Sequence, residues 1–184
     1  MPTPLSRRSF LSKSATLAAV GAVAGAGTTP DQARALNLAD TIEGPVFAST
    51  WAFGKAANEA AQRTLANGDL LDAIEQGIRL VEADASNHSV GLGGTPNANG
   101  VVELDACIMD GTTYNAGSVA GMTGIAHPIS VARRVMEKTK HVMLVGAGAR
   151  AFALDQGLEA AELLTENRRQ KWEVWKKEQI EMSL

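Results

Sequence analysis

Residues 89–111 read SVGLGGTPNANGVVELDACIMDG and join a glycine-rich turn to a long apolar run. Gly91, Gly93 and Gly94 stand where a tight turn needs left-handed backbone angles, which glycine adopts without a steric penalty. We expect this turn to bring its backbone close to another part of the molecule. The following run, 101–109, is rich in apolar and β-branched residues and predicts a buried strand.

Three chemically distinctive residues lie in or directly after this run. Asp105 and Asp110 must be paired or solvated if the strand is buried. Cys107 is the one cysteine of the sequence, so an intramolecular disulfide is excluded. Its apolar neighbours predict a small buried side chain, with a nucleophilic cysteine as the less favoured alternative.

The composition predicts one globular domain with an aliphatic core. Of the 184 residues, 45% are hydrophobic and only 4% are aromatic. Such a core suits layers of helices and sheets, and the mixed order of the expected elements predicts an α+β fold. A formal net charge of -3 argues against nucleic acid as a partner.

Hydrophobic spacing and turn residues give a coarse assignment of the remaining elements. Strands are expected at 45–50, 101–109, 114–122 and 141–146. Helices are expected at 53–65, 70–83 and 128–138, and two more begin at Ala149 and Asn167. The turn residues at 110–113 predict that the strands on either side form an antiparallel hairpin.

The first residues are similar to a twin-arginine export signal. SRRSFLSK at 6–13 holds Arg7 and Arg8, and an alanine- and glycine-rich apolar run too short to span a bilayer follows. Small-residue cleavage motifs occur at 24–26 and 33–35. We therefore expect a signal and short leader over 1–35, a mature region over 36–184, and a periplasmic or secreted protein.

Five motifs occur in the order found in one enzyme family. They are STWAFG at 49–54, SVGLGGTP at 89–96, LDACIMDG at 104–111, HPISVAR at 127–133 and KHVMLVG at 140–146. From about Val46 to about Trp175 the chain resembles the glycosylasparaginases, which belong to the N-terminal nucleophile hydrolases and cleave the bond between N-acetylglucosamine and asparagine. The resemblance implies a four-layer αββα sandwich with two stacked antiparallel sheets.

The resemblance also implies a threonine nucleophile on a second chain. In this family, the precursor cleaves itself before a threonine in an Asp-Thr-Ile-Gly motif, and the new terminal amine serves that threonine as general base. The near match at 40–43, DTIE, precedes the first expected strand and is interpreted as chance. We expect an α-chain portion that ends before the nucleophile threonine, carries no catalytic residue and is inactive without its β chain.

By the same resemblance, three residues support the site. Trp51 matches the tryptophan at the edge of the substrate pocket, and Thr50 and Ser89 match hydroxyls near the nucleophile. A core tryptophan at a strand end is the alternative for Trp51. Ala52 departs from the asparagine or proline of known relatives. The implied partners are the β chain and an asparagine-linked glycan or aspartyl-glucosamine, with a dimer of αβ units as a further expectation and no cofactor.

Other functions have weaker support. An isoaspartyl peptidase or plant-type asparaginase keeps the superfamily and changes the substrate, and a non-catalytic binding module keeps only the fold. The spacing Gly146-x-Gly148-x-x-Ala151 after a strand is typical of dinucleotide-binding turns, but no second strand with an acidic end is expected after it.

Isolated histidines and a tryptophan pair complete the candidate residues. His88, His127 and His141 are far apart in the sequence, so no metal site is predicted. Trp172 and Trp175 lie one helical turn apart in a charged helix and are expected to pack against the core or a partner chain.

Overall fold

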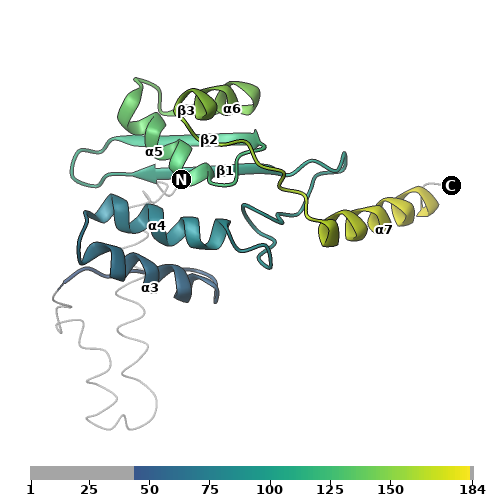
Figure 1. Cartoon of the computed structure of the whole chain (residues 1–184), viewed down its shortest axis with the longest axis horizontal. Helices are drawn as coiled ribbons and strands as arrows, with labels where there is room; N and C mark the ends of the chain where they lie inside the picture. Colours follow the sequence, from purple (N-terminus) through teal and green to yellow (C-terminus); the bar gives the residue numbers. More distant parts are fainter. Residues whose placement is uncertain (1–43, 183–184) are drawn as a thin grey trace, which may run out of the picture. The chain divides into compact units, whose positions relative to one another are not determined.

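The computed structural model describes residues 44–182, and the chain divides into one unit over Met1–Val46 and another over Phe47–Leu184. All the helices and strands of the described part lie in the second unit (Figure 1). The signal residues Arg7 and Arg8, both cleavage motifs and the DTIE match at 40–43 fall outside the described residues.

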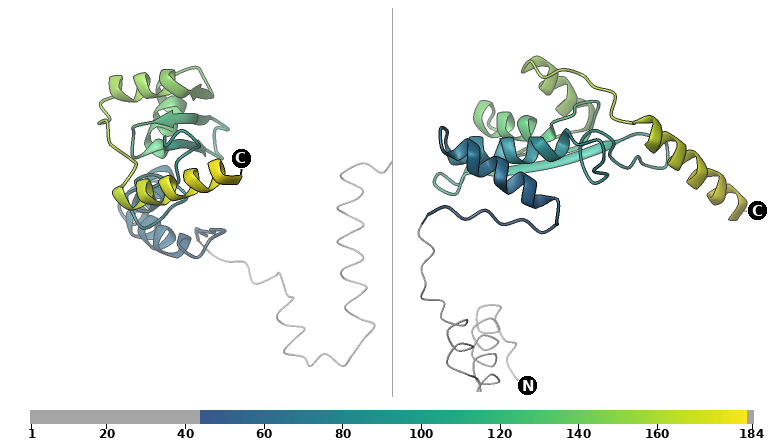
Figure 2. Two further views of the ribbon diagram at one scale, coloured as in Figure 1. Left: turned by 90° about the vertical axis from the view of Figure 1, so that its right-hand side faces the viewer. Right: turned by 60° about the horizontal axis from the view of Figure 1, so that its bottom comes forward.

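Two antiparallel helices form the first layer of this unit. Helix α3 spans Gly54–Leu65 and α4 spans Leu70–Glu82, so both sequence predictions are confirmed almost to the residue. Asp69 caps α4 by accepting a hydrogen bond from a backbone N–H of its first turn. The helices pack closely at Gly77, where an added Cβ atom would lie only 2.7 Å from the Ala57 carbonyl oxygen. Figures 1 and 2 show the pair side by side.

A mixed sheet of three strands follows, in the order β1-β2-β3. Strands β1 (Glu103–Met109) and β2 (Ala116–Thr123) pair antiparallel, which confirms the predicted hairpin. Strand β3 covers only Met143–Val145 and pairs parallel with β2. The expected strand at 141–146 is therefore shorter than predicted, and its side chains are mostly exposed rather than buried.

The strand expected at 45–50 is not formed. The segment 45–49 has no regular structure and is held by Asn58 of α3 instead. The Asn58 side chain donates to the Phe47 carbonyl oxygen at 3.3 Å and accepts from the Ser49 hydroxyl at 2.6 Å. A short run with β propensity becomes a strand only where another strand pairs with its backbone, and no described strand does so here.

Two helices cover one face of the sheet. They are α5 (Pro128–Lys138) and α6 (Gly146–Asp155), and both were predicted. Helix α5 approaches β2 closely at Gly117, where a Cβ atom would lie 2.1 Å from the Ala132 carbonyl oxygen. The shared core is aliphatic, as the composition predicts, and consists of Val119, Met122, Ile125, Val131, Val135, Ala149 and Ala153.

The opposite face of β1 is exposed, which corrects the prediction of a fully buried strand. Leu104 and Ile108 are buried toward the helices, whereas alternate side chains point away from them. Cys107 belongs to the exposed set and is not the buried small side chain that we expected. Glu103 and Asp105 follow this alternation, but the second half of the run hides it, because Cys107 and Met109 are as hydrophobic as their buried neighbours.

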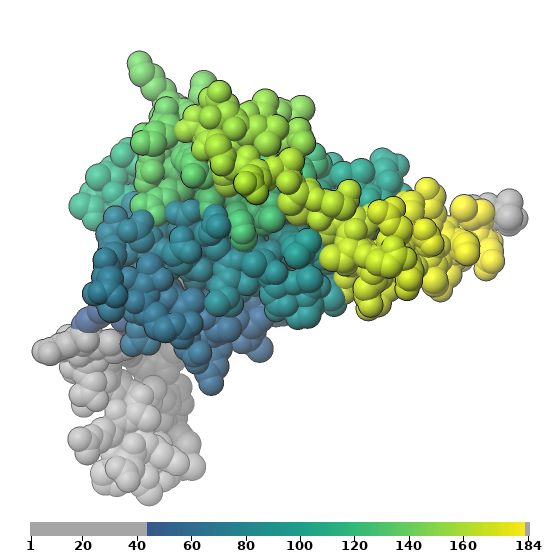
Figure 3. All heavy atoms as spheres, in the orientation of Figure 1, coloured from purple at the N-terminus to yellow at the C-terminus, as the bar shows by residue number. Residues whose placement is uncertain are grey.

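Helix α7 (Glu166–Met182) ends the described chain. Before it, residues 156–165 have no regular structure, and the Gly93 N–H donates to the Leu163 carbonyl oxygen at 2.9 Å. The space-filling view shows α7 in yellow against the teal segment that precedes β1 (Figure 3). The described residues are thus α+β, with a single sheet in place of the two stacked antiparallel sheets that the resemblance implies.

Candidate functional site

Thr50 and Trp51 lie in the turn that begins α3. The Gly54 N–H donates to the Trp51 carbonyl oxygen at 2.9 Å, which closes the turn at the start of the helix. Both side chains are exposed, and Trp51 exposes 69% of its surface. The alternative of a core tryptophan is therefore excluded within the described structure. An indole this exposed is available to contact a ligand or another polypeptide segment.

Ser89 lies in the α4–β1 loop, which we define as residues 83–102. The Ser89 backbone N–H donates to the Asn87 side-chain oxygen at 2.9 Å, and its hydroxyl points to no hydrogen-bond partner within residues 44–182. The loop is anchored by the Leu92 N–H, which donates to the Glu82 carbonyl oxygen at 2.8 Å. Ser89 is thus held by its backbone while its hydroxyl stays exposed.

The glycines of this loop behave largely as predicted. Gly91 and Gly93 have φ of 62° and 77°, whereas Gly94 does not adopt a left-handed angle. A Cβ atom at Gly91 would lie 2.0 Å from the Glu82 carbonyl oxygen, and one at Gly93 would lie 2.7 Å from that of Ala85. The close approach expected from the sequence is therefore the packing of the loop on the end of α4.

The three predicted residues lie at one end of the helical pair, but no hydrogen bond joins them among the described residues. Because α3 and α4 are antiparallel, the start of α3 and the end of α4 share that end (Figure 1). Trp51 precedes the first helix and Ser89 follows the second. The described part of the chain therefore leaves two hydroxyls and an indole exposed in the segments at this end of the pair.

No described serine or threonine hydroxyl donates to a histidine side chain, so residues 44–182 contain no hydroxyl nucleophile paired with an imidazole base. Likewise, this part of the chain holds no cluster of three or more His, Cys, Asp or Glu side chains suited to a metal ion.

The two aspartates of the opening motif have structural partners. The Asp105 carboxylate accepts from the Gly121 N–H at 2.7 Å, next to an irregularity in the β1–β2 register. Asp110 closes the hairpin turn, where the Thr113 hydroxyl and then the Thr112 N–H donate to it and lower its pKa. Both aspartates therefore stabilise the hairpin.

Hydrogen bonds and charges at the loop shift the pKa values of Asp84 and His88. The Ser86 hydroxyl and backbone N–H donate to Asp84 and lower its pKa. The pKa of His88 is lowered by partial desolvation and then by the positive charges of Arg168 and Lys171. His88 is thus biased toward its neutral form beside two cations of α7.

A buried carboxylate at the end of α4 was not found by sequence reasoning. Glu82 is only 2% exposed, and its Oε1 accepts from the Ile129 N–H at 3.0 Å at the start of α5. Its Oε2 lies 3.1 Å from His127 Nδ1. His127 is therefore paired rather than isolated. Glu82 stands at the end of an ordinary amphipathic helix, and no sequence motif marks it.

The structure contains the strand and the helix that a dinucleotide-binding turn would join, but the described residues lack the second strand of a βαβ unit. Strand β3 leads directly into α6 at Gly146, which has φ of 52°. The following residues 156–165 contain no strand that an acidic residue could end. In the described residues, the glycines form a simple turn from strand to helix.

No described helix has both the length and the apolar character needed to cross a membrane.

Known proteins with similar sequences agree on one family. The model of the asparaginase family matches residues 21–184. The N(4)-(beta-N-acetylglucosaminyl)-L-asparaginase of Elizabethkingia miricola is 49% identical over 177 residues, which cover 93% of this chain and 50% of that protein. The plant-type L-asparaginase of Thermococcus kodakarensis is 39% identical over 165 residues, covering 90% and 50%.

An isoaspartyl peptidase of Salmonella typhimurium is also similar, with 45% identity over 101 residues that cover 54% of this chain and 32% of that protein. The chain spans about half the length of the first two relatives. The family match extends over most of the sequence, and the identity to both of these relatives exceeds 30%. The chain therefore belongs to the asparaginase family of amidohydrolases.

Proposed function

We propose that the protein containing this chain is a glycosylasparaginase, which hydrolyses the amide bond between N-acetylglucosamine and asparagine. The observation that carries this proposal is the 49% identity, over 93% of this chain, to a protein bearing that name. The identity to the plant-type asparaginase is lower, at 39% over 90% of the chain. The ordered motifs STWAFG and LDACIMDG favour the same substrate.

In this proposal the chain contributes the supporting half of the site. Trp51 contacts the substrate, and Thr50 and Ser89 place hydroxyls near a nucleophile carried by the β chain. These side chains are exposed and have no side-chain hydrogen-bond partners among residues 44–182, which supports this role. The chain covers 50% of the glycosylasparaginase, which leaves room for a second half that carries the threonine and completes the αββα sandwich.

The proposed chemistry needs no cofactor. A terminal amine has an unperturbed pKa of about 7.7 to 8.0, so at neutral pH it can accept the proton of the adjacent threonine hydroxyl. The hydroxyl attacks the side-chain amide carbon of asparagine, and the glycosylamine leaves with a proton. Water then hydrolyses the acyl-enzyme and releases aspartate. Donors at the developing oxyanion stabilise both tetrahedral states.

Two relatives favour a second candidate, an asparaginase or isoaspartyl peptidase that uses the same chemistry on a smaller substrate. The decisive experiment compares kcat/KM of the full-length protein for aspartyl-glucosamine, L-asparagine and a β-aspartyl dipeptide. We expect aspartyl-glucosamine to be preferred by about tenfold or more. A preference for either smaller substrate overturns the glycosylasparaginase proposal. Hydrolysis of none of the three supports the non-catalytic binding module.

We also propose that the protein is exported through the twin-arginine pathway to the periplasm or beyond. The motif at 6–13 supports this proposal. Replacing Arg7 and Arg8 together by lysine keeps the charge and should retain the protein in the cytoplasmic fraction. Arg63→Lys makes the same change on the exposed surface of α3, outside the signal and leader, and should leave the distribution unaltered. Export of the double variant at the normal level would refute the proposal.

A further inference from the structure

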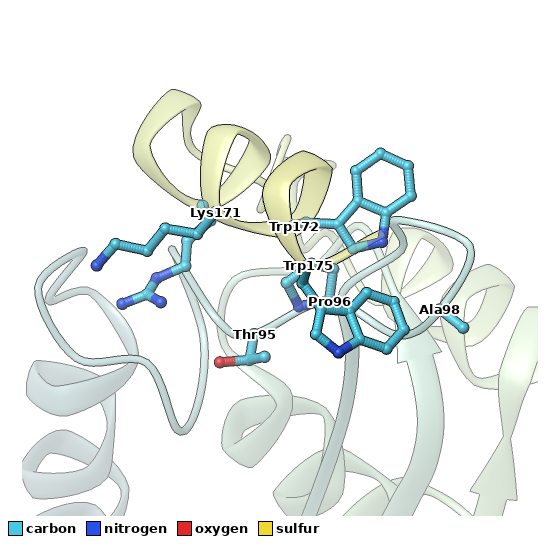
Figure 4. A pocket seen from close by; sticks show the side chains of 7 residues that line it. Thr95, Pro96, Ala98, Lys171, Trp172 and Trp175 are labelled. Carbon is cyan, nitrogen blue, oxygen red and sulfur yellow. The ribbon is translucent and has the colours of Figure 1, made fainter. Parts of the chain in front are cut away.

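A cavity of about 530 Å³ separates the α4–β1 loop from the first turns of α7. Figure 4 shows the side chains that face it: Thr95, Pro96 and Ala98 come from the loop, and Lys171, Trp172 and Trp175 come from the helix. Arg168 completes the lining. None of Thr50, Trp51 and Ser89 lines this cavity.

Arg168 is the unusual residue of this cavity. It is only 9% exposed, and its Nε and Nη2 are buried without a hydrogen-bond partner. The Trp172 Nε1 is also buried and unpaired. A buried guanidinium and indole with free N–H groups carry a desolvation penalty that an acceptor must offset. Both residues line the cavity, although these particular nitrogen atoms are themselves shielded from solvent.

Two other arginines of the described chain have carboxylate partners. Arg133 pairs with Asp72, Glu75 and Glu137, and Arg169 lies 3.8 Å from Glu166. Arg168 has no carboxylate partner within residues 44–182. Lys171 adds a second positive charge to the same cavity. The missing partner should therefore be an anion.

The walls indicate what kind of anion fits. Pro96 and Ala98 are apolar, and Trp172 and Trp175 add two aromatic side chains to the lining. Trp172 is itself positioned by Gly100, where a Cβ atom would lie 3.0 Å from the indole ring. A planar guanidinium binds a planar carboxylate through parallel N–H donors. Apolar walls favour an apolar body attached to that carboxylate.

We propose that this cavity binds a small organic carboxylate, with its carboxylate group on Arg168 and its apolar body between Pro96 and the two indoles. The site goes beyond the proposed hydrolysis and does not depend on it. The cavity volume of about 530 Å³ is in the range of small-molecule sites, about 300–1,000 Å³.

The test uses benzoate as the probe and tryptophan fluorescence of the full-length protein as the signal. Benzamide has the same shape without the charge, and inorganic phosphate has charge without an apolar body. We expect a saturable fluorescence change with benzoate and binding at least about tenfold weaker with either control compound. Absence of saturable benzoate binding, or equal binding of benzamide or phosphate, overturns the proposal.

Two matched variants locate the bound benzoate. Arg168→Gln removes the charge from the cavity and should weaken benzoate binding by about tenfold or more. Arg169→Gln removes the neighbouring charge of the same helix, outside this cavity, and should leave binding unchanged. Circular dichroism checks that both variants fold. A folded R168Q protein that binds benzoate normally refutes the assignment. If R168Q unfolds, the contrast between benzoate and benzamide in the unaltered protein still decides.

Discussion

Trp51 is the residue for which exposure carries the most functional weight. Its indole is 69% exposed at the start of α3, although large aromatic side chains are usually buried at least in part. The sequence motif STWAFG marks this residue, and the structure leaves its ring free. The sequence draws attention to Asp105 and Asp110 but does not reveal what they do. The partner of Asp105 lies across the hairpin, and that of Asp110 lies within the hairpin turn.

A first prediction concerns Trp51 and the proposed hydrolysis. Trp51→Ala should lower kcat/KM of the full-length protein for aspartyl-glucosamine by about tenfold, which corresponds to about 1.4 kcal/mol of transition-state binding. Tyr114 is 77% exposed in the β1–β2 turn, and Tyr114→Ala serves as the control for loss of an exposed aromatic ring. Steady-state kinetics measure both variants. Normal kcat/KM in the Trp51 variant removes this residue from the substrate site.

A second prediction concerns Glu82, whose buried carboxylate links the end of α4 to the start of α5. Glu82→Ala leaves the Ile129 N–H without its acceptor and should lower the free energy of unfolding by about 2–3 kcal/mol. Glu59→Ala, on the exposed face of α3, should change it by less than about 0.5 kcal/mol. Urea denaturation measures both values. Equal stability of the two variants would show that the Glu82 contacts contribute nothing.

At the scale of elements, local signals predicted the helices well and the strands less well. The Asp69 cap and the proline that opens α5 are local features, and both helices begin where these residues stand. The segment 45–49 and the short β3 depend on backbone partners that no local pattern reveals. The two faces of β1 differ clearly only in its first half, where Glu103 and Asp105 are exposed, because Cys107 and Met109 are as apolar as the buried Ile108.

Packing between α5 and β2 gives a third prediction. Gly117→Ala places a Cβ atom against the Ala132 carbonyl oxygen and the Met136 side chain, so the helix must move away from the strand. We expect a loss of about 1–3 kcal/mol in unfolding free energy. Gly111→Ala lies in the turn of the same hairpin, where a Cβ atom meets nothing within 4 Å, and should be nearly neutral. Thermal denaturation compares them, and a neutral Gly117 variant would contradict the close approach.

The ion pairs between α4 and α5 give a fourth prediction, for pH dependence. The Arg133 guanidinium donates to Asp72 at 2.6 Å and lowers the pKa of that carboxyl below its usual 3.8. A carboxylate whose pKa is lower in the folded state stabilises the fold above its usual pKa, and this contribution is lost as the pH falls through the folded value.

Asp72→Asn should therefore lower the urea midpoint at pH 6 and flatten its decline as the pH falls below 3.8. Asp155→Asn removes an exposed carboxylate of α6 and should keep the acid-dependent decline of the unaltered protein. Denaturation curves recorded from pH 6 downward give both slopes. An unchanged slope in the Asp72 variant would assign the acid sensitivity to other carboxylates.

At the scale of the whole molecule, the sequence predicted which family the chain belongs to but only part of its site. Thr50, Trp51 and Ser89 were selected by motifs, and the structure places the segments that carry them at one end of the α3–α4 pair. The cavity around Arg168 was not predicted, because its two walls are about 70 residues apart and meet only through folding. The sequence predicted packing roles for Trp172 and Trp175 but gave no role to Arg168, which lines the same cavity.

A fifth prediction concerns the division of the enzyme into two parts. Residues 1–184 expressed alone should show no measurable hydrolysis of aspartyl-glucosamine, because the proposed nucleophile belongs to the β chain. Co-expression with the remaining polypeptide should restore activity, whereas co-expression with a version lacking its N-terminal threonine should not. Release of aspartate, followed by a coupled assay, measures all three. Hydrolysis by residues 1–184 alone would contradict the prediction.

The exposed Cys107 offers a built-in chemical reporter. It is the single thiol of this sequence, in the middle of β1 on the face that the helices leave open. A maleimide reagent therefore modifies residues 1–184 at one known position. Quantifying the modified peptide by mass spectrometry, with and without the remaining polypeptide, tests whether the proposed β chain shields that side of the sheet. Assembly can thus be followed without introducing any substitution.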